Sequence, residues 1–276
     1  MTDFLAVTDL VVEYRRGRRL PPVRATDHVS FSIEAGETLG LVGESGSGKS
    51  TLGDAILGFA PVVSGSVAFR GEDILRASAA RRRQLTRDIQ VIFQNPYGSL
   101  NPSKTIGDTL TEPLRCHRLA DRRGALAKAA EWLELVGLDA SALPKYPTDF
   151  SGGQRQRVAI ARALILEPQL VICDEAVSAL DLSIQAQVLN LLTDLKGRLG
   201  VTYLFITHDM AVVAYMADRV AVLHHGRLVE IGDARDLTSH PTDPYTQALI
   251  AAAPLPDPVE QRRRRSAAPE TKGDQP

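Results

Sequence analysis

The chain has 276 residues, of which 44% are hydrophobic and 24% are charged, and this balance is typical of a globular protein with one large core. A formal net charge of −1 argues against a general nucleic-acid-binding protein, because such proteins carry a clear basic excess. The two cysteines, Cys116 and Cys173, lie outside any CxxC or Cys/His cluster, so we expect reduced thiols, a cytosolic setting and no zinc or iron–sulfur site.

We expect neither a secretory leader nor a membrane span. The first residues, MTDFLAVTDL, lack the basic segment and the apolar run of a signal peptide. No window approaches about 18 uninterrupted apolar residues. If this protein acts at a membrane, we therefore expect it to do so through other chains.

Strands dominate the first third of the chain. Alternation of apolar and polar residues predicts half-exposed strands over 4–14 and 28–34, and the range 64–74 is expected to form another strand with turns at both ends. The apolar run TLGLV (38–42) predicts a buried strand that leads into the glycine-rich GESGSGKST (43–51) and then into a helix ending near Gly58. Another short strand is expected at 89–93.

Helices and apolar strands alternate in the rest of the chain. Residues 104–149 are mostly helical by pattern, with an apolar stripe made of Trp132, Leu133, Leu135 and Val136. A helix is expected after FSGGQ (150–154), and the apolar strand LVIC (170–173) ends at an Asp-Glu pair. The remaining elements are expected as a helix at 184–199, a strand at 202–207, a short helix, and two strands within 219–231.

This order of elements indicates the α/β fold class with a parallel core sheet. The N-terminal strands would form a separate antiparallel β lobe, and residues of about 95–165 would form an inserted α-helical subdomain. Residues 1–253 then make up one domain. The extension 254–276 is rich in Pro, Arg and Ala and is expected to be disordered beyond about Pro258.

The stretch GESGSGKS (43–50) matches the phosphate-binding pattern GxxxxGK[ST] between a predicted strand and a predicted helix. Its glycines let backbone N–H groups surround phosphates, and the helix N-terminus adds partial positive charge. Lys49 would contact the β- and γ-phosphates, and the Ser50 hydroxyl would bind Mg²⁺. A glycine-rich turn without a ligand is disfavoured, because each glycine costs roughly 0.5–1 kcal/mol relative to alanine. The predicted nucleotide contacts are Gly43, Glu44, Ser45, Gly46, Ser47, Gly48, Lys49, Ser50 and Thr51.

The stretch LVICDE (170–175) is a buried strand that ends in two adjacent acids, the form of a Walker B motif. Asp174 can reach the metal through water, and Glu175, one residue beyond the strand, is placed to polarise the attacking water. Simple helix capping by the Asp-Glu pair is the alternative. It is disfavoured because four apolar residues precede the pair in a chain that also carries a phosphate loop.

Three further side chains are candidates for the same site. His208 ends the strand at 202–207 and can donate a hydrogen bond to the γ-phosphate, where charge gathers in the transition state; a capping or core histidine is the alternative. Gln94 follows the strand at 89–93 and can reach both metal and water. Tyr14 can stack on adenine, with packing in a strand as the alternative.

Together these motifs resemble the ATPase subunits of ABC transporters over residues 4 to about 258. Walker A (43–51), a Q-loop at Gln94, Walker B (170–175), a D-loop that ends at Asp181 and an H-loop at His208 occur in the family's order. The family's signature lies between the Q-loop and Walker B, as Ser151, Gly152, Gly153 and Gln154.

The resemblance implies a P-loop NTPase with a RecA-like core and a helical subdomain, which binds ATP with Mg²⁺. In the family two such domains face each other head to tail. Ser151 and the amides of Gly152 and Gly153 would then complete the site of the neighbouring subunit, and Gln154 and Asp181 would also contact its nucleotide. A Ser-Gly-Gly turn that opens a helix can bind an anion, so this arrangement gives a reason for a second anion-binding helix start in a chain that already has a phosphate loop.

Four stretches are more specifically similar to the oligopeptide/dipeptide importer branch, which also includes nickel importers: NPYGSLNP (95–102), KYP (145–147), SALDLSIQAQVLNLL (178–192) and HPTDPYTQAL (240–249). One departure is Ala176, where the branch usually has proline after the catalytic glutamate. Losing the proline ring frees the backbone at that point. Because the Glu175 carboxylate remains, we still expect hydrolysis.

The resemblance implies an ATP-hydrolysing subunit bound peripherally to the cytoplasmic face of the inner membrane. Its partners would be a second ABC ATPase subunit, identical or related, two membrane-spanning permease chains and, indirectly, an extracytoplasmic solute-binding protein that selects the cargo; nucleic acid would not be a partner. A non-transport ABC ATPase in DNA repair or translation is disfavoured by the single motif set and the lack of heptads. An exporter ATPase is disfavoured by the importer-like stretches.

Three groups of arginines lie outside these motifs. Solvated turns are expected around the first two groups, which are Arg15, Arg16, Arg18 and Arg19, and then Arg81, Arg82 and Arg83. The third group, 262–265, lies in the tail and would either touch anionic lipid headgroups or remain solvated.

Overall fold

In the computed structural model, residues 3–15, 17 and 20–252 are described. The N-terminal strands form a four-stranded antiparallel sheet in the order β2-β1-β4-β5. Its strands are β1 (Leu5–Tyr14), β2 (Val23–Ile33), β4 (Val62–Phe69) and β5 (Glu72–Asp73). The apolar residues of β1 and β2 alternate toward one face, which buries Leu5 and Val7 against the rest of the molecule.

A second sheet has six strands in the order β10-β9-β3-β8-β7-β6, and only β10 is antiparallel to its neighbour. Its strands are β3 (Thr38–Val42), β6 (Ile89–Phe93), β7 (Leu170–Asp174), β8 (Thr202–Ile206), β9 (Arg219–His224) and β10 (Arg227–Asp233). Strands β3 and β8 are buried along their whole length, as expected for a parallel sheet that is covered on both faces. The two sheets confirm the predicted α/β class, with its parallel core and antiparallel lobe.

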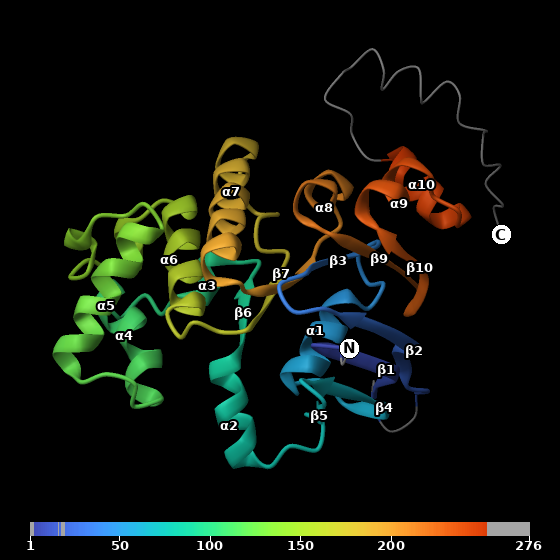
Figure 1. The fold of residues 1–276 in the computed structure, drawn as a ribbon, viewed down its shortest axis with the longest axis horizontal. Helices are drawn as coiled ribbons and strands as arrows, with labels where there is room; N and C mark the ends of the chain where they lie inside the picture. Colours follow the sequence, from blue (N-terminus) through green and yellow to red (C-terminus); the bar gives the residue numbers. More distant parts are fainter. Residues whose placement is uncertain (1–2, 16, 18–19, 253–276) are drawn as a thin grey trace.

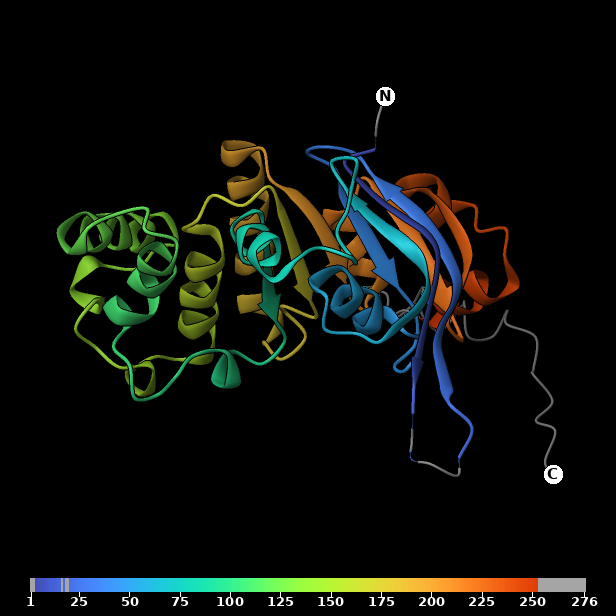
Figure 2. The same ribbon diagram turned by 90° about the horizontal axis from the view of Figure 1, so that it is seen from below.

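Helices pack against the parallel sheet, and further helices lie beyond it at both ends of the molecule (Figures 1 and 2). Four of them, which we call the helical group, are α3 (Pro96–Ser99), α4 (Ile106–Cys116), α5 (Arg122–Leu135) and α6 (Gly152–Leu164). The others are α1 (Lys49–Leu57), α2 (Ala79–Asp88), α7 (Leu182–Leu199), α8 (Met210–Met216), α9 (Ala234–Ser239) and α10 (Pro244–Ala252). The helical group lies at one end of the molecule, and α9 and α10 lie at the opposite end.

Alternate residues of the parallel strands belong to different cores. Leu170 and Ile172 of β7 face a cluster that includes α1 and the antiparallel sheet. Val171 and Cys173 face a second cluster that joins α7 to the helical group. Because successive side chains of a strand point to opposite faces, one sheet contributes residues to both hydrophobic clusters. Cys173 is a free thiol within this core, and burial raises its pKa far above the ordinary value.

In the described part of the chain, no helix has the length and apolar character needed to span a bilayer.

The expectation of a solvated turn at Arg81, Arg82 and Arg83 is wrong, because these residues lie in helix α2. Arg81 forms an ion pair with Glu72 at 2.6 Å. Arg82 donates to the carbonyl oxygens of Leu57 at 3.2 Å and Ile74 at 3.0 Å. The helix was missed because almost all of its side chains are polar and only Leu85 is buried, so apolar periodicity is absent.

Smaller differences concern boundaries and one side chain. The second strand begins at Val23 rather than at 28, and the range 64–74 covers most of β4, which begins at Val62, and the two-residue strand β5. Leu135, expected in the apolar stripe, is 38% exposed, whereas Trp132 and Leu133 are buried. The expectations for Arg16, Arg18, Arg19 and the tail 254–276, including 262–265, concern residues outside the described ones.

Candidate active site

The carboxyl ends of four neighbouring strands define the site. Across the parallel sheet, Leu41 of β3 pairs with Ile206 of β8, Ile206 pairs with Asp174 of β7, and Asp174 pairs with Phe93 of β6. Neighbouring strands lie roughly 4.8 Å apart, so residues that follow this row are neighbours in space. The predicted residues that follow it by one or two positions are Gly43, Glu175, His208 and Gln94.

The loop between β3 and α1 has the shape of a phosphate-binding loop because two glycines are required there. Gly43 and Gly48 have φ values of 151° and 103°, which L side chains rarely adopt. A Cβ atom on Gly43 would lie 2.1 Å from the Leu223 carbonyl oxygen, and one on Gly48 would lie 2.3 Å from the Ala25 carbonyl oxygen. The loop is therefore closely enclosed by β9 and by β2.

The Lys49 ammonium is held inside this loop. Its Nζ donates to the carbonyl oxygens of Gly43 and Glu44, both at 2.7 Å. Burial lowers the pKa of Lys49, and the negative charges of Glu175 and Asp174 oppose that effect. An ammonium has three donors, and two of them are used by the loop itself.

Ser50 and Asp174 form an oxygen pair at the start of α1. The Ser50 hydroxyl donates to Asp174 Oδ1 at 2.9 Å. Burial raises the pKa of Asp174, and the hydrogen bond from Ser50 acts in the opposite direction. Hydroxyl and carboxylate oxygens are ligands that suit Mg²⁺. The buried Ser47 hydroxyl has no hydrogen-bond partner within the described chain, so the loop also offers a group that a phosphate oxygen would satisfy.

Glu175 adopts an uncommon backbone conformation beside His208. Its φ is 49°, in the left-handed region, which costs a non-glycine residue about 1–3 kcal/mol and occurs at functional sites as well as in turns. The Glu175 N–H donates to the Ile206 carbonyl oxygen at 2.9 Å, and Glu175 Oε1 lies 3.4 Å from His208 Nδ1. The two side chains are 20% and 56% exposed, so water can reach the pair.

The signature residues lie at the start of α6 and cap that helix. The Ser151 hydroxyl accepts from the Gln154 N–H at 3.3 Å, and Gln154 Oε1 accepts from the Ser151 N–H at 3.0 Å. A Cβ on Gly153 would lie 2.5 Å from the side chain of Ile184 on α7. In the described chain, none of the hydrogen bonds of Ser151 or Gln154 reaches residues 43–51, so the structure does not join the two predicted anion-binding regions.

The other predicted residues occupy separate positions. Asp181 caps α7, where it accepts from the Ile184 N–H at 3.0 Å, and Gln94 is exposed just after β6. Tyr14 is 38% exposed at the end of β1, opposite Val23 of β2. Ser45 is exposed, and Thr51 is half-buried on α1.

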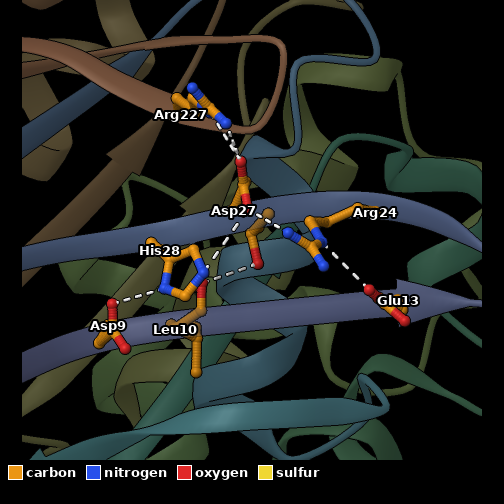
Figure 3. Close-up of polar contacts among 8 residues, drawn as sticks. Asp9, Leu10, Glu13, Arg24, Asp27, His28 and Arg227 are labelled. Atoms are coloured by element: carbon orange, nitrogen blue, oxygen red, sulfur yellow. Dashed lines mark hydrogen bonds and ion pairs between the residues drawn. The ribbon is translucent and has the colours of Figure 1, made fainter.

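Ionic contacts around Asp27 tie the antiparallel sheet to the surroundings of the loop (Figure 3). The Asp27 carboxylate accepts from Arg24 Nη1 at 2.7 Å and from Arg227 Nε at 2.6 Å, and these two bonds lower the pKa of Asp27. The Asp27 N–H donates to the Gly226 carbonyl oxygen at 2.8 Å, and the Gly226 N–H donates to the Ser47 carbonyl oxygen at 2.9 Å. The turn at Gly226 therefore links β2 to the phosphate loop.

Two contacts to the site come from residues that the sequence patterns did not single out. Gln156, fully buried on α6, donates from Nε2 to the carbonyl oxygen of Ala176 at 2.7 Å, next to Glu175. The Tyr245 hydroxyl on α10 accepts from the Glu44 N–H at 3.0 Å. Tyr245 lies in the stretch 240–249 that resembles the importer branch, and Gln156 lies just after the signature 151–154, but neither resemblance carries information on these contacts.

Comparisons with known proteins agree with this geometry. Residues 26–178 match the family model described as ABC transporter, and residues 229–275 match the one described as oligopeptide/dipeptide transporter, C-terminal region. The chain is 52% identical over 243 residues to the glutathione import ATP-binding protein GsiA of Escherichia coli (strain K12), and 50% identical over the same length to that of Salmonella choleraesuis. The alignment covers 88% of this chain but only 39% of each relative.

Two solved structures share the fold. One is cbiO1 from Clostridium perfringens, part of the ABC transporter complex cbiONQ, with a TM-score of 0.76 and 25% identity over 87% of this chain and 92% of that chain. The other is the dimeric ATP-binding cassette MJ0796 in a post-hydrolysis state bound to ADP and phosphate, with a TM-score of 0.75 and 28% identity over 84% of this chain and 99% of that chain. These neighbours confirm the predicted P-loop architecture.

Proposed function

Because this chain belongs to the ABC transporter family, we propose that it is the ATP-hydrolysing subunit of an importer for peptides or a related small solute. The observation that carries the proposal is one sheet edge with three groups in place: Lys49 in the phosphate loop, the Ser50–Asp174 pair, and Glu175 beside His208. The match of the C-terminal region and the relatives named for glutathione import favour an importer over an exporter or a non-transport ATPase.

Nucleotide binding follows from the donors of the loop. The N–H groups within residues 43–51, apart from that of Glu44, which donates to Tyr245, and the Lys49 ammonium would bind the β- and γ-phosphates, and Tyr14 would stack on adenine. The Ser50 hydroxyl, Asp174 through a water, and Gln94 would hold Mg²⁺, which neutralises phosphate charge when bound. Both charged groups, Lys49 and Asp174, lose hydration at this site, and a bound magnesium nucleotide would compensate for that loss.

Hydrolysis would be performed by the pair at the end of β7 and β8. Glu175 would accept a hydrogen bond from the attacking water, and His208 would donate one to the γ-phosphate. The second subunit would supply its own signature, so that Ser151, Gly152 and Gly153, with Gln154 and Asp181, act on the nucleotide of its neighbour. We treat residues 1–253 as the ATPase domain, with 95–165 as its helical subdomain and 254–276 as an extension.

The proposed assembly is a dimer of ATPase subunits, identical or related, beneath two membrane-spanning permease chains. The subunit would lie at the cytoplasmic face of the inner membrane, and an extracytoplasmic solute-binding protein would select the cargo. Closure on ATP and reopening after hydrolysis would be passed to the permeases near Gln94 and 95–102. Nucleic acid has no part in this scheme.

Binding of Mg-ATP by the purified full chain tests the site. Lys49→Ala should weaken binding more than tenfold, because the loop then lacks the cation that faces the phosphates, and calorimetric titration measures the change. Lys128→Ala is the control, since Lys128 lies on α5 in an ion pair with Glu167, and it should bind like the wild type. Equal binding by all three proteins would mean that the loop is not the nucleotide site.

Transport requires a separate test. Purification in mild detergent should recover membrane-spanning chains with this subunit, whereas ribosomes or DNA would support the non-transport alternative. Uptake of labelled dipeptides and oligopeptides by cells that express the complete system should fall with Lys49→Ala. Uptake of nickel alone would identify the other cargo class of the branch.

A further inference from the structure

Helix α10 touches the phosphate loop although 201 residues separate the two partners. The Tyr245 hydroxyl accepts a hydrogen bond from the Glu44 N–H at 3.0 Å. In Figure 1, α10 lies beside α9, β9 and β10, at the end of the molecule remote from the helical group. The C-terminal region of the chain thus contributes directly to the first turn of the loop.

The Tyr245 ring is held by stacking. It lies parallel to the ring of His224, with a centroid distance of 3.7 Å and an interplanar angle of 15°. His224 ends β9, and in that strand Val222 pairs with Val42, the residue directly before Gly43. The His224 ring, on which Tyr245 stacks, and the start of the loop therefore follow two adjacent strands of one sheet, β9 and β3.

The start of α10 is also clamped to the sheet. Glu230 of β10 accepts from the Thr242 N–H and hydroxyl, both at 2.8 Å, and from the Asp243 N–H at 3.2 Å. Asp243 in turn accepts from the Tyr245 N–H at 2.8 Å. These bonds fix the start of α10 against β10 and so restrict movement of Tyr245 away from Glu44.

Glu44 is bound from its other side by the loop itself. Its carbonyl oxygen accepts from Lys49 Nζ at 2.7 Å and from the Ser47 N–H at 3.2 Å. When Lys49 turns toward phosphates, it must share or give up its bonds to the carbonyl oxygens of Gly43 and Glu44. The hydrogen bond from the Glu44 N–H to the Tyr245 hydroxyl does not involve Lys49, so movement of Lys49 does not require its loss.

We propose that Tyr245 is a positioning residue for ATP binding, which holds the first turn of the phosphate loop in its phosphate-accepting shape while Lys49 moves to the nucleotide. The inference rests on the proposed function, because it assumes that the loop binds ATP. The hydrogen bond from Glu44 to Tyr245 pre-organises the loop, and this strengthens binding of ATP in the ground state and in the transition state equally. Losing it raises KM for ATP and leaves kcat unchanged. A phenol suits the role because one side chain supplies both a stacking face and a polar tip.

Tyr245→Phe in the full chain removes the hydroxyl and keeps the ring on His224. The expected result is a Kd and a KM for Mg-ATP that rise about 2- to 10-fold, the range for one neutral hydrogen bond, with kcat unchanged. Hydrogen exchange of the amides in 43–48 should become faster in the nucleotide-free protein. Tyr215→Phe is the matched control, because the Tyr215 hydroxyl contacts Asn190 on α7, away from the loop, and it should change none of these values.

Tyr245→Ala separates a positioning role from a structural one. It removes the stack as well, so it should lower Tm, and Tyr245→Phe should restore Tm but not ATP affinity. If Tyr245→Phe binds Mg-ATP like the wild type with unchanged exchange, or if Tyr215→Phe weakens binding equally, the inference is wrong and the proposed function stands. If the wild type itself binds no Mg-ATP, the proposed function fails and the inference fails with it.

Discussion

At the residue scale, the site holds two charged groups whose pKa values move in opposite directions. Burial lowers the pKa of Lys49 and raises that of Asp174, so each charge is less stable here than in water. The left-handed backbone of Glu175 adds conformational strain. A site that is costly to form without a ligand is consistent with selection for binding and catalysis.

Asp174→Asn should raise the Tm of the nucleotide-free protein near neutral pH. The raised pKa of Asp174 means that the folded state binds its proton more tightly than the unfolded chain, so ionisation costs folding free energy as the pH rises through that pKa. Asparagine keeps an oxygen for Ser50 and carries no charge. The gain should vanish below the ordinary pKa range of aspartate, where both side chains are neutral.

Calorimetry between about pH 3 and about pH 8 checks this expectation, because the lower limit lies below the ordinary pKa of aspartate. Asp194→Asn, an exposed aspartate on α7, serves as the control and should leave Tm unchanged. A stabilisation by Asp174→Asn of the same size at every pH would exclude the desolvated carboxylate as its cause.

Glu175→Gln should bind Mg-ATP normally and hydrolyse it at least about 10²-fold more slowly, because the amide cannot accept a proton from water. ATP-loaded dimers should therefore accumulate, and gel filtration with radiolabelled ATP measures them. Glu131→Gln on the exposed side of α5 is the control. Normal turnover by Glu175→Gln would remove this residue from its assigned role.

At the element scale, Ser151 and Gln154 at the start of α6 have two assigned roles, one within the helix and one toward a neighbouring subunit. Ser151 and Gln154 form a capping box that completes the helix, while the resemblance assigns the same residues to a neighbouring nucleotide. Helix α6 also contacts the turn that follows Glu175, since Gln156 Nε2 donates to the Ala176 carbonyl oxygen. Movement of this helix would therefore displace the backbone of Ala176, the residue next to Glu175.

Ser151→Ala should lower stability by about 1 kcal/mol through the lost cap and lower the hydrolysis rate of the paired protein by about 10²–10³-fold. The matched control is Asp121→Ala, since Asp121 caps α5 by accepting from the Gly124 N–H at 2.7 Å. That variant should lose comparable stability but retain hydrolysis. Thermal unfolding and phosphate release measure the two effects, and equal losses of activity in both variants would assign Ser151 to the cap alone.

At the scale of the whole molecule, the architecture separates the two anion-binding helix starts. The antiparallel sheet and the Gly226 turn enclose the phosphate loop, whereas the signature belongs to the helical group on the other side (Figure 1). In the proposed dimer, one chain would present one half of each of two sites. This separation is the structural basis for proposing a head-to-tail dimer.

A mixed dimer tests that arrangement. Combining a Ser151→Ala subunit with a Lys49→Ala subunit should leave one complete site, because both defects fall in the same composite pocket. Placing both substitutions in one subunit beside a wild-type partner should damage both pockets. Single-turnover hydrolysis should therefore persist in the first mixture and be lost in the second, and equal loss in both would contradict sharing between chains.

Much of the fold was predictable, and most candidate residues could be nominated, because their signals are local. An apolar run such as LVIC must be withdrawn from water, and a polar pair directly after it must lie at the edge of the sheet. Glycines at 43, 46 and 48 mark positive φ values that the structure does contain. Helix α2 was missed because it has few apolar residues, and its Arg82 is anchored by the carbonyl oxygens of Leu57, at the end of α1, and of Ile74.

The sequence by itself determined the fold class, the order of motifs and the chemical groups that arrive at the carboxyl edge of the sheet. Only the tertiary structure decided which of those groups touch: that Lys49 is held by the loop, that Glu175 faces His208, and that Tyr245 reaches Glu44. The reason is physical. Motifs depend on residues a few positions apart, whereas these contacts depend on strand order and packing between segments far apart in the chain.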